Sequence, residues 1–277
     1  MKIEFTKMHG LGNDFVVIDN MAGGVNLTTE QVVFLCDRHK GVGADGVILI
    51  EPGDGAGSTG SLQADCFMNY INADGSFAGM CGNGVRCTAK FVRDNLFQNK
   101  KESKTDFKIV TRTGIKEVKF YQEDETFSVN MGKPSFTSPD FEKDEMELKG
   151  LKVNLVFFGN PFAVSFVDDL YAHDFEVLGP SIENDKSFPN RMNFELVEKV
   201  NEKEYKVRVW ERGCGETMAC GTGSCAVYSV LRKLGNTENE ITIEFPGGKL
   251  YLSEDKDGFV IMRGGAVSVF SSIIELV

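Results

Sequence analysis

The chain has 277 residues, a hydrophobic content of 42% and a formal net charge of −11 at pH 7. This length and apolar content are sufficient for one large domain or two medium-sized domains. The negative charge disfavours nucleic acid and anionic membrane surfaces as partners, because both require clustered lysine and arginine, and we expect a small-molecule substrate instead.

The cellular compartment is predicted from three features of the sequence. Residues 1–7 include an acidic side chain and no long apolar run, unlike a signal or transit peptide. No stretch reaches the roughly 18 apolar residues that span a bilayer. The seven cysteines, an odd number, argue against a disulfide framework. We therefore expect a cytoplasmic protein with reduced thiols and no membrane partner.

In chain order, the first predicted helix lies at residues 30–36, where Thr28 and Gln31 have the spacing of a capping box. A buried strand is predicted at residues 46–50. Residues 51–61 are rich in glycine and almost free of apolar side chains. They are predicted to form a surface loop.

Two glycine-rich turns each place a cysteine at the start of a predicted apolar helix. Cys81 opens the sequence Cys-Gly-Asn-Gly before the helix of residues 85–92, and Cys220 opens Cys-Gly-Thr-Gly before the helix of residues 224–231. The free N–H groups and the dipole at a helix start favour negative charge. We therefore predict two thiols of lowered pKa, which would suit a paired acid and base.

Short strand-like runs alternate with turns through the rest of the chain. These runs lie at residues 108–111, 116–120, 126–130, 152–158, 240–245 and 259–262, with hairpin turns at 111–114 and 245–248. They follow one another too closely for a parallel sheet with crossover helices. The predicted fold class is α+β, with mainly antiparallel strands around one helix in each half.

The two halves of the chain follow one plan. A polar residue stands nine positions before the cysteine in each half, Asn72 in the first and Glu211 in the second. Each half also has a Gly-Asn pair before an apolar strand, at residues 12–13 and 159–160. This recurrence predicts a duplicated half-domain.

Eight segments of the sequence, in this order and spacing, resemble the diaminopimelate epimerase family. They cover residues 8–15, 41–45, 72–76, 81–87, 159–161, 188–193, 211–217 and 219–226. The resemblance implies two similar lobes, each a β-barrel-like sheet around a central helix, with the active site in the cleft between them. We expect an N-terminal lobe at residues 1–128, completed by a strand at 265–277, and a C-terminal lobe at 129–264.

The same resemblance implies the chemistry. One cysteine from each lobe faces the substrate α-carbon in that family, which assigns Cys81 and Cys220 as the acid and base. The implied activity converts LL-diaminopimelate to the meso form, for lysine and peptidoglycan precursor synthesis, with no pyridoxal phosphate, metal or other cofactor. A homodimer remains open as the assembly.

The resemblance also implies the residues that hold the substrate. The family's side-chain contacts fall on Asn13, Asn72, Asn160, Asn193, Glu211 and Arg212. Backbone N–H groups at the two helix starts, from Gly82, Asn83, Gly221 and Thr222, are expected to hold the α-carboxylate as it gains negative charge.

Two departures from the family pattern leave the substrate open. Phe162 stands where the family often has histidine, and Gly46 stands where it often has glutamine. The same chemistry on another amino acid is therefore the first rival hypothesis. Two function classes without this chemistry also stay open: a cysteine hydrolase, and a binding protein that has no catalytic activity.

The remaining cysteines are expected to have no catalytic role. Cys36, Cys66, Cys87 and Cys225 lie within apolar runs and are predicted to be core residues, whereas Cys214 lies in a turn. A zinc site is disfavoured, because no Cys-Xaa-Xaa-Cys pair is present and the chain has only three histidines.

Overall fold

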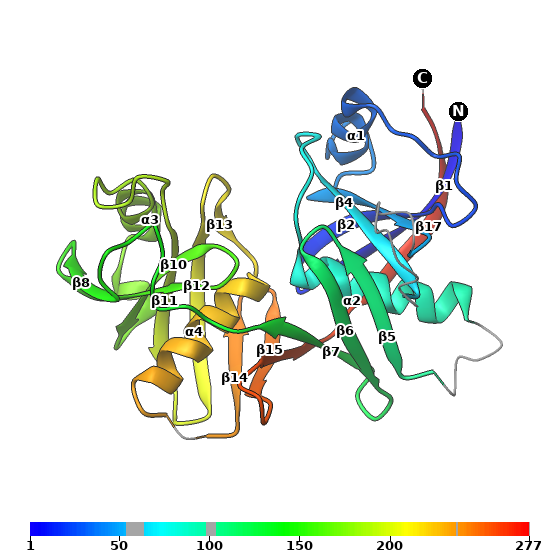
Figure 1. Ribbon diagram of the computed structural model, residues 1–277. Coiled ribbons are helices and arrows are strands. Elements are labelled where there is room, and N and C mark those ends of the chain that lie inside the picture. The colour runs from blue at the N-terminus through cyan, green and yellow to red at the C-terminus, as the bar shows by residue number, and fades with distance from the viewer. Residues whose placement is uncertain (54–63, 98–103, 237, 277) are drawn as a thin grey trace. The chain divides into compact units, whose positions relative to one another are not determined.

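The computed structural model describes residues 1–53, 64–97, 104–236 and 238–276. The structure is an α+β fold in which strands predominate, as predicted (Figure 1). The chain divides into two compact units, one of Met1–Val129 with Gly264–Val277 and one of Asn130–Arg263. Most of the glycine-rich loop predicted at residues 51–61 lies outside the described residues.

The first unit surrounds one buried helix with strands. Its elements are β1 (Lys2–Gly10), β2 (Asn13–Asp19), α1 (Thr29–Cys36), β3 (Gly46–Glu51), β4 (Cys66–Asn72), α2 (Gly82–Phe91), the single π-helical turn η1 (Val92–Leu96), β5 (Asp106–Thr111), β6 (Gly114–Tyr121), β7 (Thr126–Gly132) and β17 (Val267–Glu275). The predicted capping box of Thr28 and Gln31 is present at the start of α1. The predicted hairpin turn at residues 111–114 joins β5 to β6.

The second unit repeats this arrangement. Its elements are β8 (Glu145–Leu148), β9 (Leu151–Phe157), β10 (Pro161–Val167), the 3-10 turn η3 (Leu170–Ala172), α3 (Phe175–Glu183), β11 (Asn193–Lys199), β12 (Glu204–Glu211), β13 (Gly215–Thr217), α4 (Gly221–Lys233), β14 (Glu240–Phe245), β15 (Gly248–Glu254) and β16 (Val260–Gly264). The second predicted hairpin joins β14 to β15.

The strand pairings confirm the predicted duplication. In the first unit β1–β2 is antiparallel, β2–β3 parallel, β3–β4 antiparallel and β4–β5 parallel. The second unit has the same series in β9–β10, β10–β11, β11–β12 and β12–β14. The outer strand β17 pairs with β1 as β8 pairs with β9, both antiparallel. Position by position, β3 therefore corresponds to β11 and α2 to α4.

The expectation of mainly antiparallel strands is confirmed, but each unit also contains two parallel pairs, which the close spacing of the strand-like runs did not predict. Each parallel pair has a helix in its crossover: α1 between β2 and β3, α2 between β4 and β5, and their counterparts α3 and α4. A parallel connection needs such a crossover. The helices are short, so each crossover fits between strands that lie close together in the sequence.

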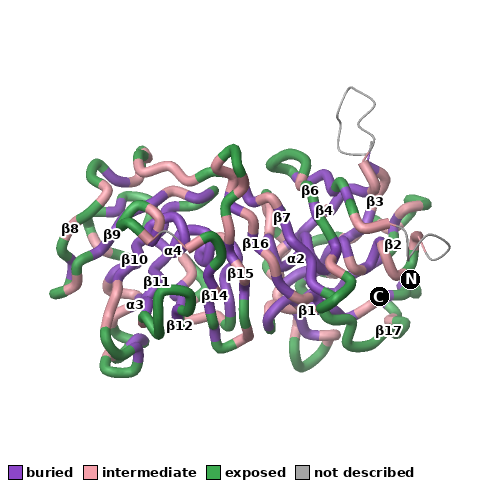
Figure 2. The backbone as a smooth tube through the Cα atoms, turned by 90° about the horizontal axis from the view of Figure 1, so that it is seen from below, coloured by how far each residue is buried: buried purple, intermediate pink, exposed green. Residues whose placement is uncertain are grey.

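The central helices form the cores of the two units. Figure 1 shows α2 among the strands of the first unit and α4 among those of the second. Most residues of both helices are buried (Figure 2). The buried residues include the polar Arg86 and Ser224. A helix covered by strands on most sides keeps its first turn in a fixed place, and that first turn carries the cysteine in each unit.

Candidate active site

Cys81 is the N-cap residue of α2, as predicted. Its backbone is extended, with φ −139° and ψ 120°, and its sulfur accepts a hydrogen bond from the Gly84 N–H at 3.5 Å. The first N–H groups of a helix have no acceptor within the helix. The N–H groups of Gly82 and Asn83 are therefore available at the same end of α2 as the sulfur.

Asn13 connects Cys81 to a set of fixed side chains. Its Oδ1 atom accepts from the Cys81 thiol at 3.5 Å and from Asn83 Nδ2 at 3.2 Å. Its Nδ2 atom donates to Asp45 Oδ2 at 2.7 Å. Asn83 is held in turn by Arg86, whose Nη2 donates to Asn83 Oδ1 at 2.8 Å. The structure therefore brings together three residues that the sequence assigned to the site: Asn13, Cys81 and Asn83.

Asp45 was not among the predicted site residues, yet it orients Asn13. Arg38 Nη2 lies 2.8 Å from Asp45 Oδ1 and 2.8 Å from Asp14 Oδ1. Burial opposes the charge of Asp14, but hydrogen bonds from Arg38 and Lys7 outweigh burial and hold the pKa of Asp14 below its usual value. Asp45 belongs to the segment 41–45 that resembles the family, and this was the signal that marked it.

Asn72 lies at the end of β4, as predicted, but it holds a turn. Its Nδ2 donates to Ser76 Oγ at 3.0 Å, and its backbone N–H donates to the Ser76 carbonyl at 2.8 Å. Its partner in the ladder is Gly46. A Cβ atom on Gly46 would lie 2.5 Å from Tyr70 Cε2 and 2.6 Å from the Ile71 carbonyl oxygen. The backbone beside Asn72 therefore excludes a glutamine side chain while Tyr70 is packed as it is here.

Cys220 is the N-cap residue of α4, in the position that corresponds to Cys81. Its sulfur accepts from the Gly223 N–H at 3.3 Å and lies 3.5 Å from Thr222 Oγ1. The prediction of a lowered pKa is wrong for Cys220. Burial raises its pKa well above the usual value, and the charges of Glu211 and Glu195 raise it further, while the bonds from Thr222 and Gly223 oppose the rise without balancing it.

Glu195 is a buried acid that the sequence motifs did not identify. It lies on β11 with an exposed fraction of 0%, and neither carboxyl oxygen has a hydrogen-bond partner among the described residues. Burial raises its pKa well above the usual value, and the charge of Glu211 adds to the rise. The sequence signal was a single glutamate inside the apolar run Phe-Glu-Leu-Val at residues 194–197.

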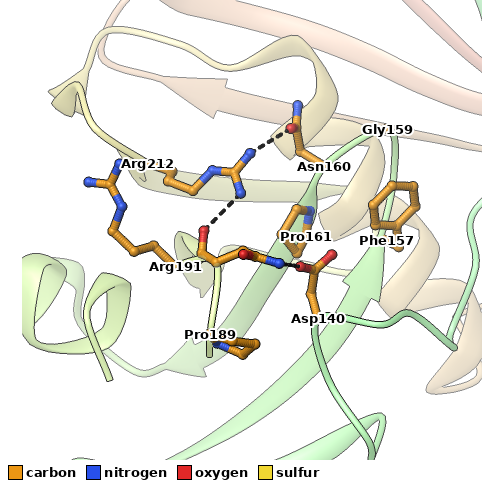
Figure 3. A pocket seen from close by; sticks show the side chains of 9 residues that line it. Asp140, Phe157, Gly159, Asn160, Pro161, Pro189, Arg191 and Arg212 are labelled. Carbon is orange, nitrogen blue, oxygen red and sulfur yellow. Dashed lines mark hydrogen bonds between the residues drawn. The ribbon is translucent and has the colours of Figure 1, made fainter. Parts of the chain in front are cut away.

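Asn193, Arg212 and Asn160 form a second group in the same unit. Asn193 Oδ1 accepts from the Arg212 backbone N–H at 2.9 Å, and Asn193 Nδ2 donates to the Pro161 carbonyl at 2.9 Å. The Arg212 guanidinium donates to Asn160 Oδ1 at 3.1 Å and to the Asn190 carbonyl at 2.9 Å (Figure 3). The sequence therefore assigned three residues to the site that the structure places together.

A pocket of about 630 Å³ adjoins this group (Figure 3). It is lined by Asp140, Phe157, Gly159, Asn160, Pro161, Pro189, Asn190, Arg191 and Arg212. Arg191 pairs with Glu183 at 3.0 Å, whereas Arg212 makes no ion pair with a carboxylate within the described ranges. The charge of Arg212 is therefore available to an anion that enters the pocket.

Glu211 ends β12 next to this group, as predicted. Its Oε1 accepts from Thr217 Oγ1 at 2.5 Å, and its backbone pairs with Gly215 of the short strand β13. Glu211 also acts through its charge on Cys220. Glu211 therefore connects the group of Asn193, Arg212 and Asn160 to the start of α4.

Comparison with known proteins decides the family. The family model described as "Diaminopimelate epimerase" matches residues 5–137 and 155–269. The chain is 40% identical to the diaminopimelate epimerase of Synechococcus elongatus over 291 residues, covering 100% of this chain and 99% of the relative. It is 38% identical to that of Acinetobacter baylyi, covering 100% and 98%. The chain belongs to the diaminopimelate epimerase family.

Solved structures agree on the fold. A PhzF-family phenazine biosynthesis protein of Bacillus anthracis covers 100% of both chains with a TM-score of 0.70 at 19% identity. A hydroxyproline epimerase of Agrobacterium vitis covers 99% of this chain and 92% of its own, with a TM-score of 0.69 at 12% identity. The family assignment makes the protein an isomerase of the epimerase class.

Most of the other residues singled out in the sequence of this epimerase family member are buried. Phe162, which stands where the resemblance implies a histidine, is buried on β10. The four predicted core cysteines are buried and Cys214 is exposed. Across the described residues, no group of histidine, cysteine and acidic side chains has the arrangement of a metal site. In that same part of the chain, no helix combines the length and the apolar character needed to cross a bilayer.

Proposed function

We propose that the protein converts LL-diaminopimelate to the meso form with Cys81 and Cys220 as acid and base. The observation that carries this proposal is the repeated N-cap cysteine. Each unit places a thiol at the free N–H end of a buried helix, in a frame shared by both halves. The names of the family and of its relatives supply the substrate.

The proposed reaction needs two groups because a proton leaves one face of the α-carbon and another returns to the opposite face. One cysteine, as thiolate, forms an S–H bond with the departing proton. The other cysteine breaks its S–H bond and gives its proton to the carbon, keeping the electron pair as a new thiolate. Proton count and charge are unchanged, and the configuration of the carbon is inverted.

The helix starts supply the stabilisation that this proton transfer requires. Removal of an α-proton places negative charge on the substrate carboxylate, and free N–H groups at a helix start bind such an anion. In this proposal the donors are Gly82 and Asn83 on α2 and Gly221 and Thr222 on α4. Because the donors are backbone N–H groups, their positions depend on the helix and not on the side chains of these four residues.

The far end of a diamino diacid carries a second carboxylate and a second ammonium group. Arg212, fixed by Asn160 and lacking a carboxylate partner in the described part of the chain, suits the carboxylate. Glu211 suits the ammonium group. Asn193 holds the Arg212 backbone and would position both residues.

Exchange of the substrate α-proton in deuterated water tests the proposal. We expect deuterium in LL- and meso-diaminopimelate and none in a panel of monocarboxylic amino acids. Exchange with only another amino acid would overturn the substrate assignment, and the panel is needed because Phe162 and Gly46 depart from the family pattern. No exchange with any amino acid, from folded protein with reduced thiols, would overturn the epimerase chemistry.

We also propose that the reaction serves lysine and peptidoglycan precursor synthesis in the cytoplasm. The substrate of the named relatives supports this role. Expression of the chain in a bacterium that lacks its own diaminopimelate epimerase should restore growth without added meso-diaminopimelate. Failure of an expressed, active protein to restore growth would contradict the proposed pathway.

A further inference from the structure

The helix start of the second unit contains an acid that its counterpart in the first unit lacks. Glu195 is the third residue of β11 and pairs with Val164 of β10. The third residue of β3 is Ile48, which pairs with Val17 of β2. The two positions correspond, so the duplicated frame presents an isoleucine behind one cysteine and a glutamate behind the other.

Both side chains approach the first turn of their helix at the same glycine. In the first unit, Ile48 Cδ1 lies 3.2 Å from the place where a Cβ atom on Gly84 would be. In the second unit, Glu195 Oε1 lies 1.8 Å from the corresponding place on Gly223, and Cys220 Cβ lies 3.1 Å from it. Glu195 therefore occupies the space of the missing side chain, beside the residue whose N–H donates to the Cys220 sulfur.

The position of Glu195 is costly for a charged carboxylate. The side chain is fully buried, and neither oxygen finds a hydrogen-bond donor within the described ranges. A buried carboxylate without a partner is strongly destabilised relative to the neutral acid. A buried acid of this kind can influence whether a neighbouring group becomes negatively charged.

Two acids act on Cys220 through their charge. Glu195 reaches it from β11 and Glu211 from β12. Of the other strands that pack on α4, β10 has no titratable side chain, β9 carries Lys152, and β15 carries Lys249, Tyr251 and Glu254. Negative charge on any one of Cys220, Glu195 and Glu211 therefore opposes charge on the other two.

We propose that Glu195 is a positioning residue that keeps Cys220 in the thiol form, so that Cys220 enters the reaction as the proton donor. This inference rests on the proposed epimerase function. Glu195 lies beside the first turn of α4, so a negative charge on its carboxyl group resists formation of the Cys220 thiolate. While Glu195 is protonated, the thiolate that Cys220 becomes in the reaction lies beside a neutral acid.

The test follows thiol ionisation at each cysteine in the free protein. Iodoacetamide alkylates thiolates, and peptide mass spectrometry resolves Cys81 from Cys220 at each pH. In Glu195→Gln, which keeps the shape and removes the ionisable group, the pH midpoint for alkylation of Cys220 should fall by about one unit or more. The midpoint for Cys81 should stay unchanged, because the residue that corresponds to Glu195 behind Cys81 is the uncharged Ile48.

Two further variants keep the test decisive. Glu195→Ile copies the packing of Ile48 and should lower the Cys220 midpoint in the same way if Glu195→Gln does not fold. Glu204→Gln, an exposed change on β12, is the matched control and should leave both midpoints in place. An unchanged Cys220 midpoint in either folded Glu195 variant would overturn the proposal, as would a Cys220 midpoint of ordinary value in the wild-type protein.

Two different measurements distinguish failure of this inference from failure of the proposed function. Alkylation needs no substrate, whereas deuterium exchange reports the reaction itself. We expect Glu195→Gln to retain epimerase activity near neutral pH and to shift the alkaline limb of its pH profile. A shifted Cys220 midpoint without any epimerase activity in the wild type would refute the function, whereas normal activity with an unshifted midpoint would refute only the role of Glu195.

Discussion

The two helix starts have nearly the same backbone and very different surroundings. Both cysteines are extended N-cap residues, and each sulfur accepts from the N–H three residues later. Around Cys81 lie the carboxamide of Asn13 and an apolar side chain, Ile48. Around Cys220 lie two carboxyl groups, Glu195 and Glu211. A duplicated frame therefore fixes where the thiol lies in each unit, while a few side chains on the strands behind it set its chemistry.

The largest effect should come from removing either thiol. Cys81→Ala and Cys220→Ala should each lower the rate of epimerisation by roughly 10²–10⁴-fold, because each removes one of the two proton-transfer groups. Circular dichroism should show both variants folded. The matched control is Cys214→Ala, an exposed cysteine that should keep full activity. Retained epimerisation in either N-cap variant would refute the two-thiol mechanism.

Gly84 and Gly223 are corresponding glycines in the first turns of α2 and α4. Gly223→Ala places a methyl group on Glu195 Oε1 and should destabilise the fold by about 1–3 kcal/mol. Gly84→Ala should cost less, because the nearest atom to its added methyl group is Ile48 Cδ1 at 3.2 Å. Urea unfolding measures both. If Gly223→Ala is destabilised through Glu195, adding Glu195→Ala should recover part of the loss, and simple additivity of the two changes would argue against it.

A smaller loss should follow from loosening Asn13. Asp45→Ala removes the acceptor that holds Asn13 Nδ2, so the carboxamide beside Cys81 is free to turn. A hydrogen bond to a charged group is worth about 1.5–3 kcal/mol, and kcat/KM should fall by about tenfold or more. Asp257→Ala, an exposed change in the other unit, should leave kcat/KM unchanged. Equal activity in both variants would remove Asp45 from the site.

The smallest effect should be a pH dependence of stability in the first unit. The pKa of Asp14 is lower in the folded protein than in the unfolded chain, so its contribution is complete above the unfolded pKa of about 3.9 and is lost as the pH falls below that value. Asp14→Asn should therefore lower the melting temperature at neutral pH and approach the wild-type value in acid. A constant difference at all pH values would contradict this assignment.

Features that depend on neighbouring residues could be predicted from the sequence. The capping box of Thr28 and Gln31, the two hairpin turns and the N-cap position of both cysteines all have local signals, and all are present. The duplication was visible because the polar residue and the cysteine recur at the same spacing in each half.

Features that depend on distant segments were missed. Glu195 lies 25 positions before Cys220, and nothing in the apolar run around it reveals that its oxygens reach the first turn of α4. The prediction of a lowered pKa for Cys220 was wrong for the same reason. The helix start was visible in the sequence, whereas the burial of Cys220 and the approach of Glu195 were not. Asp45, 32 positions after Asn13, is a third case.

The pairing of β1 with β17 joins two strands that lie far apart in the sequence. They are aligned antiparallel from Lys2 opposite Glu275, and the Met1 amino group donates to the Leu276 carbonyl at 2.5 Å. During synthesis, β1 therefore leaves the ribosome long before its partner exists, and the first unit completes its sheet only after β17 has been made. Linking β17 to β1 and opening the chain elsewhere would give a circular permutant whose first unit is continuous and free to fold as it emerges.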